Sequence, residues 1–219
     1  MPEGVCIKGY VIGFEFVSLH FQKFKKKLKM MRNNLTALLC ALLISLGASA
    51  QTWKVDPNHA SIMFNAKHSG ISFVNGRFMQ FEATVEGGTP EDFTGAKVSF
   101  TAQVNSINTG VEARDKDLKS ANFFDMENHP TISFVSKSFT KTGDHTYKVV
   151  GDLTMRGNTR EVELVAKHIG STKTRDGLNK VGFQLTGSVD RNDFGISGAA
   201  SSVAPIIEII CNAEMSEQK

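Results

Sequence analysis

The sequence predicts an all-β protein, an eight-stranded antiparallel barrel with one short helix over a barrel opening. Apolar and polar residues alternate with a period of two along most of the chain after residue 50, which is typical of strands with one buried face. Short turn sequences separate these segments, so neighbouring strands are expected to be antiparallel. One-sided antiparallel sheets close as a barrel or stack as a sandwich. The expected strands reach roughly ten residues, against about five or six for an average strand, and this length favours the barrel.

The individual strands follow from the alternation. In the segment 62–68, for example, Phe64 and His68 share the inward face, and in the segment 79–85 Met79 shares it with Phe81. The expected strands are a short one at 53–56 and eight long ones at 62–68, 79–85, 98–104, 132–134, 147–155, 162–167, 181–189 and 207–213. Glycine-containing pairs of the kind found in tight hairpins predict turns at Asn75-Gly76, Gly157-Asn158 and Asp176-Gly177.

One segment departs from the strand pattern and predicts a short helix at 111–122. Thr109 and Glu112 have the spacing of a capping box, in which a hydroxyl and a carboxylate satisfy free backbone donors at a helix start. Phe123 and Phe124 follow the helix directly. We expect this segment to be a lid over the barrel mouth, anchored through residues 114 and 115. The alternative is that the two phenylalanines only seal the end of the core.

The first fifty residues differ from the rest of the chain. A basic start at Arg32, an apolar run at 35–46 and the small residues 48–50 together describe a secretory signal peptide cleaved near Ala50. We therefore expect residues 1–50 to comprise an N-terminal extension, reflecting a translation start at Met30 or Met31, followed by the signal peptide. A long signal anchor is the alternative. Residues 51–219 form the expected mature domain, which we place in the periplasm or outside the cell.

Charge and cysteine content exclude several classes of function. Of 25 basic and 22 acidic residues, seven basic and two acidic ones lie in residues 1–50, which leaves 18 basic and 20 acidic residues in the expected domain. No block of basic residues occurs there, so nucleic acid is not expected as a partner. Cys211 is the single cysteine after residue 50. It lies on an inward face, where a lone thiol usually acts as a small hydrophobe.

No pattern of catalytic or metal-binding residues stands out. Five histidines follow residue 50, and none has a metal-ligand spacing such as HxH or HExxH. His68 and His168 share inward parity near strand ends, so they could meet at a barrel rim, where bonds to backbone are a simpler role than a metal site. The sequence also lacks GxSxG. We expect no catalytic residue and no metal ligand.

The inward face leaves two alternatives open. An eight-stranded barrel is wide enough either to pack solid or to hold one small ligand. Twelve of the 16 phenylalanines follow residue 50, many with inward parity, and a dry core and a ligand tunnel would both show this.

A series of short motifs extends over residues 52–214. They are Trp53-Lys54-Val55-Asp56-Pro57 with His59, Phe64 with His68-Ser69-Gly70, Gly76-Arg77-Phe78, Ser106-Ile107-Asn108-Thr109, Arg114-Asp115, Leu118, Phe123, Phe124, Pro130, Ile132, Phe134, Gly151-Asp152-Leu153-Thr154, Arg156-Gly157, Thr159-Arg160 and Arg191 with Asp193-Phe194-Gly195. No single motif is specific, but the order and spacing of the whole series are. In these residues the chain resembles the YceI-like family of polyisoprenoid-binding proteins. Ala60 departs from the serine that the family often has, and Ala204-Pro205 from an acidic pair, and neither changes the apolar lining.

The resemblance implies an extended, lipocalin-like barrel whose apolar tunnel holds a long-chain isoprenoid or similar amphiphilic lipid, without catalysis. It implies no cofactor other than a bound isoprenoid or isoprenoid-quinone-like lipid as ligand. Transient membrane contact and a homodimer are further candidate interactions. The alternatives are an accessory protein or enzyme of isoprenoid-quinone metabolism and a solid-cored, stress-induced interaction protein. The residues expected to bind the lipid are Phe64, His68, Phe81, Phe100, Leu118, Phe123, Phe124, Phe134, Leu153 and Phe183.

Overall fold

The computed structural model describes residues 25–27, 29–30 and 51–218. The apolar run and the cleavage site of the expected signal peptide lie outside these residues. In the described part of the chain, no helix has both the length and the apolarity that crossing a membrane requires. All of the strands lie in one unit, Ala50–Lys219.

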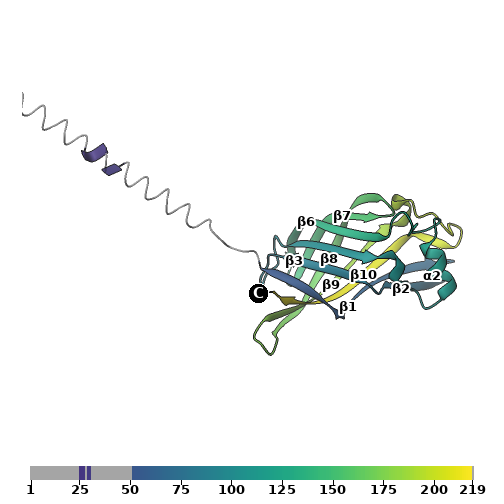
Figure 1. The fold of residues 1–219 in the computed structure, drawn as a ribbon, viewed down its shortest axis with the longest axis horizontal. Helices are drawn as coiled ribbons and strands as arrows, with labels where there is room; N and C mark the ends of the chain where they lie inside the picture. Colours follow the sequence, from purple (N-terminus) through teal and green to yellow (C-terminus); the bar gives the residue numbers. More distant parts are fainter. Residues whose placement is uncertain (1–24, 28, 31–50, 219) are drawn as a thin grey trace, which may run out of the picture. The chain divides into compact units, whose positions relative to one another are not determined.

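Ten strands, one α-helix and two 3₁₀ helices build the described part of this unit, and Figure 1 shows how they are arranged. Most of the strands are long, as the alternation predicts. The strands are β1 Thr52–His68, β2 Ser72–Phe78, β3 Phe81–Glu86, β4 Lys97–Gln103, β5 Ile107–Asn108, β6 Thr131–Gly143, β7 Thr146–Met155, β8 Asn158–Lys173, β9 Asn179–Asp190 and β10 Val203–Glu217. Helix α2 spans Glu112–Lys119, and the 3₁₀ helices are η1 Val104–Ser106 and η2 Arg191–Phe194.

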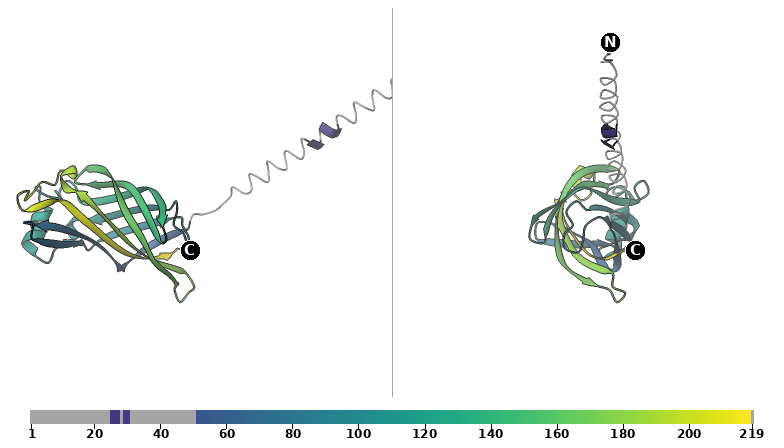
Figure 2. Two further views of the ribbon diagram at one scale, coloured as in Figure 1. Left: turned by 180° about the vertical axis from the view of Figure 1, so that it is seen from behind. Right: turned by 90° about the vertical axis from the view of Figure 1, so that its left-hand side faces the viewer.

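The sheet closes on itself because the last strand pairs with the first. The antiparallel order runs β10-β9-β8-β7-β6-β4-β3-β1, and β10 pairs again with β1. β2 and β3 act as one interrupted strand, since β3 pairs with the start of β1 and β2 with its second half. The ring therefore has eight strands, which confirms the predicted barrel, and the end-on view of Figure 2 shows it.

The two segments predicted as separate strands at 53–56 and 62–68 are one strand, β1. Its register with β10 breaks between Val55 and Ala60, where residues 56–59 face only one residue of β10. Pro57 lies in this bulge, and proline has no N–H to donate to a ladder. The bulge also marks where β1 stops pairing with β3 and begins to pair with β2. The strand therefore bends without ending.

The predicted turn at Asn75-Gly76 is wrong. Both residues lie inside β2, and the β1–β2 turn is formed instead at residues 69–71. Ser69 and Gly70 have φ values of 50° and 74°, which the turns of two-residue hairpins require. Gly76 is needed for a different reason. A Cβ there would lie 2.2 Å from Cζ of Phe64, so the glycine makes room for this inward-facing ring.

The other two predicted turns are close to the observed ones. The β7–β8 turn is one residue earlier than expected, at Arg156-Gly157, where φ is 47° and 72°, and Asn158 begins β8. The β8–β9 hairpin contains Asp176-Gly177 as predicted, with φ of 80° at the glycine.

Helix α2 is shorter than predicted and begins without the capping box. Val111 is the N-cap residue and makes no side-chain cap. Thr109 instead donates both its N–H and its hydroxyl to Oδ1 of Asp115, at 2.8 and 2.6 Å. Arg114 donates to the hydroxyl and the carbonyl of Thr109, at 2.8 and 3.0 Å. Arg114 and Asp115 thus anchor the helix, as expected, but through Thr109.

The two ends of the barrel differ. At one end, the loop 87–96 folds inward, and Phe93 packs against Trp53 and Phe183 with ring centroids 5.3 and 4.9 Å apart. Trp53 and Phe93 are fully buried. We call this the closed end. The opposite end, called the helix end, carries α2 beside β2 (Figure 1), the β1–β2 turn and the loop that follows η2.

Candidate functional site

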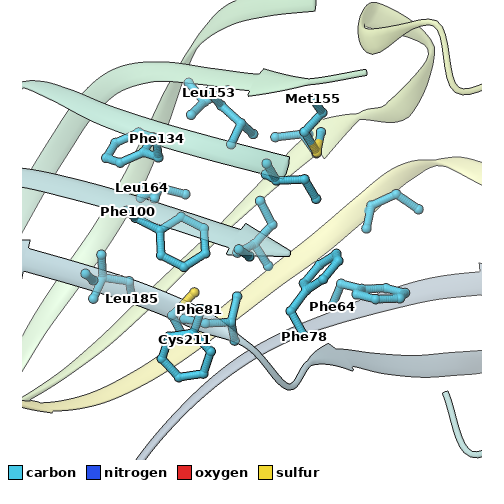
Figure 3. A pocket seen from close by; sticks show the side chains of 18 of the residues that line it. Phe64, Phe78, Phe81, Phe100, Phe134, Leu153, Met155, Leu164, Leu185 and Cys211 are labelled. Atoms are coloured by element: carbon cyan, nitrogen blue, oxygen red, sulfur yellow. The ribbon is translucent and has the colours of Figure 1, made fainter. Parts of the chain in front are cut away.

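An apolar cavity of about 230 Å³ lies inside the barrel. Its lining runs from Phe93 at the closed end to Phe124 at the helix end, and side chains from most strands point into it (Figure 3). Protein interiors usually leave few voids larger than a water molecule, and cavities of about 150 Å³ lined by apolar side chains bind apolar molecules. The tertiary structure thus favours a ligand cavity over a solid core.

The structure places nine of the ten predicted binding residues in the cavity wall. Whether they contact a lipid stays a prediction. His68 is the exception: it is the last residue of β1, and the lining ends on this strand at Ala66. The nine residues in the wall are Phe64, Phe81, Phe100, Leu118, Phe123, Phe124, Phe134, Leu153 and Phe183.

The alternation misplaced one stretch of the wall. Phe78 and Phe81 are an odd number of positions apart, yet both line the cavity, because the strand is interrupted between them. Met79, predicted to face inward, is exposed. The backbone at this break bonds outside the β1 ladder, with the N–H of Met79 donating to the carbonyl of Ser106 at 3.1 Å. A strict period of two cannot signal such a break.

Three predicted lid residues lie over the cavity at the helix end. Leu118 on α2, Phe123 and Phe124 all contribute to its wall. Phe124 meets Phe78 edge to face, with ring centroids 6.0 Å apart. Phe123 is buried against Gly198, where a Cβ would come within 2.7 Å of the ring. The segment after α2 therefore covers the helix end and packs closely against the loop that follows η2.

Similarity to known proteins covers this whole barrel. The YceI-like domain matches residues 53–215. A UPF0312 protein of Ectopseudomonas mendocina (strain ymp) is 34% identical over 190 residues, covering 84% of this chain and 98% of the relative. Protein YceI of Salmonella arizonae is 32% identical over 193 residues, covering 87% and 100%. The chain belongs to the YceI-like family.

Solved structures agree with this YceI-like barrel. The Campylobacter jejuni YCEI protein has a TM-score of 0.64 at 29% identity, covering 68% of this chain and 88% of that one. A polyisoprenoid binding domain from Saccharophagus degradans has a TM-score of 0.55 at 11% identity, covering 76% and 98%. At 11% identity, the likeness to the Saccharophagus degradans domain shows that the two proteins share a fold. The resemblance recognised in the sequence is confirmed.

Arg191 is the one charged residue among those that line the cavity of the YceI-like barrel. It is 5% exposed, and burial lowers the pKa of its guanidinium. The guanidinium is satisfied by backbone carbonyls and not by an acidic side chain. It donates to the carbonyls of Ala204 at 3.2 Å, Val203 at 2.9 Å, Ile196 and Gly198. Arg191 therefore holds the loop that follows η2, and its donors are turned to the backbone.

The two histidines expected to meet at a rim lie at opposite ends of the YceI-like barrel. His68 pairs with Val203 at the start of β10, whereas His168 pairs with Phe183, which is opposite Ala213 near the end of β10. His168 is 6% exposed and stacks on Phe183 at 5.0 Å. Its Nε2 lies 3.0 Å from the carbonyl oxygen of Gly170, and its Nδ1 has no partner.

Acidification should lower the thermal stability of the YceI-like barrel in part through His168. Burial lowers the pKa of His168 below 6.5, although Glu91 and the Gly170 carbonyl act in the other direction and His145 adds to the lowering. The unfolded chain therefore binds a proton at a higher pH than the folded chain, and stability present above pH 6.5 is lost as the pH falls.

The measurement is thermal unfolding of the wild type and His168→Phe at pH 7 and pH 5. A phenyl ring keeps the stacking on Phe183 and does not titrate. The Tm of the variant should therefore fall less than the Tm of the wild type between pH 7 and pH 5. Equal losses in both proteins would show that another group carries the pH dependence.

Cys211 faces the cavity from β10 (Figure 3), and burial raises the pKa of its thiol to about 12. The thiolate is the reactive form, so the folded protein should react with a thiol reagent at pH 8 at least roughly 100-fold more slowly than the unfolded chain. Timed labelling with and without denaturant checks this. Equally fast labelling would show that the cavity wall opens to water.

In the part of the chain that the structure describes, one group of side chains has the ligand types of a metal site. Ligand atoms of Asp56, His59 and Glu214 lie within 4.8 Å of one another at the β1 bulge. The ammonium of Lys180 lies 2.5 Å from Glu214 and 4.0 Å from Asp56, and His59 Nδ1 lies 2.7 Å from Asp56. These side chains thus already form an ion-pair cluster around a cation, and the cluster connects β9, β10 and the bulge.

Proposed function

We propose that this protein binds and carries a long-chain isoprenoid or a similar amphiphilic lipid, without making or breaking covalent bonds. The observation that carries the proposal is the chemistry of the cavity wall. Every lining residue is apolar except Arg191 and Cys211. The donors of Arg191 are bonded to carbonyls, and the raised pKa of Cys211 keeps its thiol protonated. A hydrocarbon chain suits such a wall.

Polar ligands do not suit this cavity. Burying a hydroxyl or amide without a hydrogen-bond partner costs roughly 2–7 kcal/mol. A hydrocarbon chain instead gains about 0.8 kcal/mol for each CH₂ that it buries. The polar head of an amphiphilic lipid would therefore lie at an end of the barrel, with the chain along the axis.

Two further observations support the proposal. The Saccharophagus degradans domain with the same fold is described as polyisoprenoid binding. The apolar segment before residue 51 has the pattern of a secretory signal peptide. We accordingly infer that the protein acts in the periplasm or outside the cell, where lipids that move between membranes must cross water.

Mass spectrometry of lipids extracted from the purified protein tests the proposal. The protein is expressed with its own leader, and the extract is compared with that of a control protein of similar size purified in the same way. We expect one class of long-chain lipid at close to one molecule per barrel. An extract without enriched lipid would contradict the proposal and favour an interaction protein. Conversion of the lipid on addition of a redox cofactor would favour an enzyme of quinone metabolism.

Replacing Phe124 by alanine should speed release of the bound lipid more than it lowers thermal stability. The ring lies over the cavity and is only half buried, so its loss opens the helix end while removing little packing from the core. Release into an excess of acceptor vesicles, followed with a fluorescent lipid, measures the first effect, and thermal unfolding measures the second. A Tm lowered by several degrees with unchanged release would identify Phe124 as a structural plug.

A further inference from the structure

Exposed apolar side chains gather at one edge of the helix end. Ile71, in the β1–β2 turn, is 89% exposed, Phe73 on β2 is 53% exposed and Ile206 on β10 is 50% exposed. We call these three residues the edge patch. Isolated exposed apolar residues are normal, whereas a group of them suggests a surface for interaction.

Strand pairing places Phe73 and Ile206, two residues of the edge patch, on one outer face. Phe73 pairs with Lys67 across β2 and β1. Ala66 pairs with Ile207 across β1 and β10, and both line the cavity. Because side chains alternate along a strand, their neighbours Lys67 and Ile206 point outward on adjacent strands. Lys67 thus lies between two exposed apolar side chains.

Lys67 makes none of the ion pairs found among residues 51–218. Asp190, which pairs with Ile206, accepts a hydrogen bond from the N–H of Asn192 at 2.9 Å. A free ammonium between apolar side chains complements a surface that is apolar beneath an anionic layer.

The apolar character stops abruptly one row further from the edge. There Asn75 donates to Asn65 at 2.6 Å, and Asn65 donates to Glu208 at 3.2 Å. This row of hydrogen-bonded polar side chains crosses β2, β1 and β10. Only the outermost row of side chains can therefore be buried without desolvating polar groups. This limits insertion to the depth of a lipid headgroup layer, and it argues against a large protein–protein interface.

The edge patch adjoins the end of the cavity. The N–H of Ser69, in the turn that carries Ile71, donates to the carbonyl of Ser202 at 2.6 Å. Val203, the next residue, lines the cavity. Ser202 and Val203 belong to the stretch 195–207, which has no charged residue. This stretch can therefore approach a membrane without desolvating a charge.

We propose that the edge patch docks the barrel on the surface of a bilayer that contains anionic phospholipids, with Lys67 at the phosphates and Ile71 and Phe73 among the upper acyl groups. This inference rests on the lipid-carrier function proposed above. Membrane-surface binding scales with the buried apolar area and with attraction to anionic lipids. Docking here would bring the cavity end to the source of its ligand.

Vesicle flotation tests the proposal with the loaded, full-length mature protein. Vesicles of phosphatidylcholine with phosphatidylglycerol should bind the wild type, and the double variant Ile71→Ser/Phe73→Ser should bind at least tenfold more weakly. Lys67→Gln should weaken binding several-fold to these vesicles and leave binding to pure phosphatidylcholine unchanged. The control, Val165→Ser/Ile169→Ser, removes two exposed apolar side chains from β8, outside the edge patch, and should bind like the wild type.

Two outcomes would overturn the proposal: a control variant that loses as much binding as the double variant, or a wild type that does not float. Lipid content, measured on the same samples, separates this inference from the carrier function. Protein that carries lipid but does not float contradicts docking alone, and protein that floats without carrying lipid contradicts the carrier function. Ile71→Cys labelled with a polarity-sensitive fluorophore gives a second readout, because the raised pKa of Cys211 is expected to keep that thiol protonated and to direct the label to residue 71. The emission of the label should shift to the blue on binding.

Discussion

Phe100→Asp should abolish lipid binding and lower the Tm by on the order of 10 °C. Phe100 lies on β4 between Ala83 and Phe134 of the neighbouring strands, and its side chain lines the cavity. The wall is apolar apart from Arg191, whose donors are bonded to carbonyls, and the Cys211 thiol, which is a weak donor. An introduced carboxylate would therefore be buried without a strong hydrogen-bond partner, which costs several kcal/mol. Thermal unfolding and lipid extraction measure the two effects on the same sample.

Two further variants make this result interpretable. Val165→Asp places the same carboxylate on the exposed face of β8 and should leave both the lipid content and the Tm close to those of the wild type. Phe100→Ala keeps the wall apolar and should preserve the fold while reducing the amount of bound lipid. If Phe100→Ala binds lipid as the wild type does, Phe100 does not contact the ligand.

Arg191→Met should lower the free energy of unfolding by about 3 kcal/mol or more. The methionine keeps an apolar side chain of similar length at the cavity wall but cannot donate hydrogen bonds. Carbonyls of Ala204, Val203 and Ile196, among others, would lose their donor in a part of the structure where Arg191 is almost fully buried. Chemical denaturation of both proteins measures the difference.

The matched control for this experiment is Arg160→Met. Arg160 lies exposed on β8 and donates to the carbonyl of Thr159 at 2.8 Å. Because water can replace that donor, the control should change stability by less than about 0.5 kcal/mol. A wild-type stability in Arg191→Met would mean that the loop following η2 is held by its other contacts, such as those of Arg156 with the carbonyls of Gly195 and Ala121.

The sequence determined the strand content and the chemistry of the interior. Alternation is a local property, because successive side chains of a strand point to opposite faces wherever the strand lies. It therefore identified Phe64, Phe81 and Phe100 as inward-facing before any pairing was known. The same rule failed at Met79, where the strand is interrupted.

Only the tertiary structure decided how the interior is packed. Phenylalanines with inward parity are compatible with a solid core and with a tunnel, and the choice depends on how far rings from opposite walls of the barrel reach toward each other. At the closed end, Phe93 meets Phe183 and fills the space; between there and Phe124 a cavity remains. The role of Arg191 depends on carbonyls in the loop that follows η2 and at the start of β10. The edge patch combines residues of the β1–β2 turn, β2 and β10. Both arise from contacts between different segments of the chain or from segments without periodicity. Local sequence patterns carry no signal for such contacts, because the distances involved exist only once the barrel has closed.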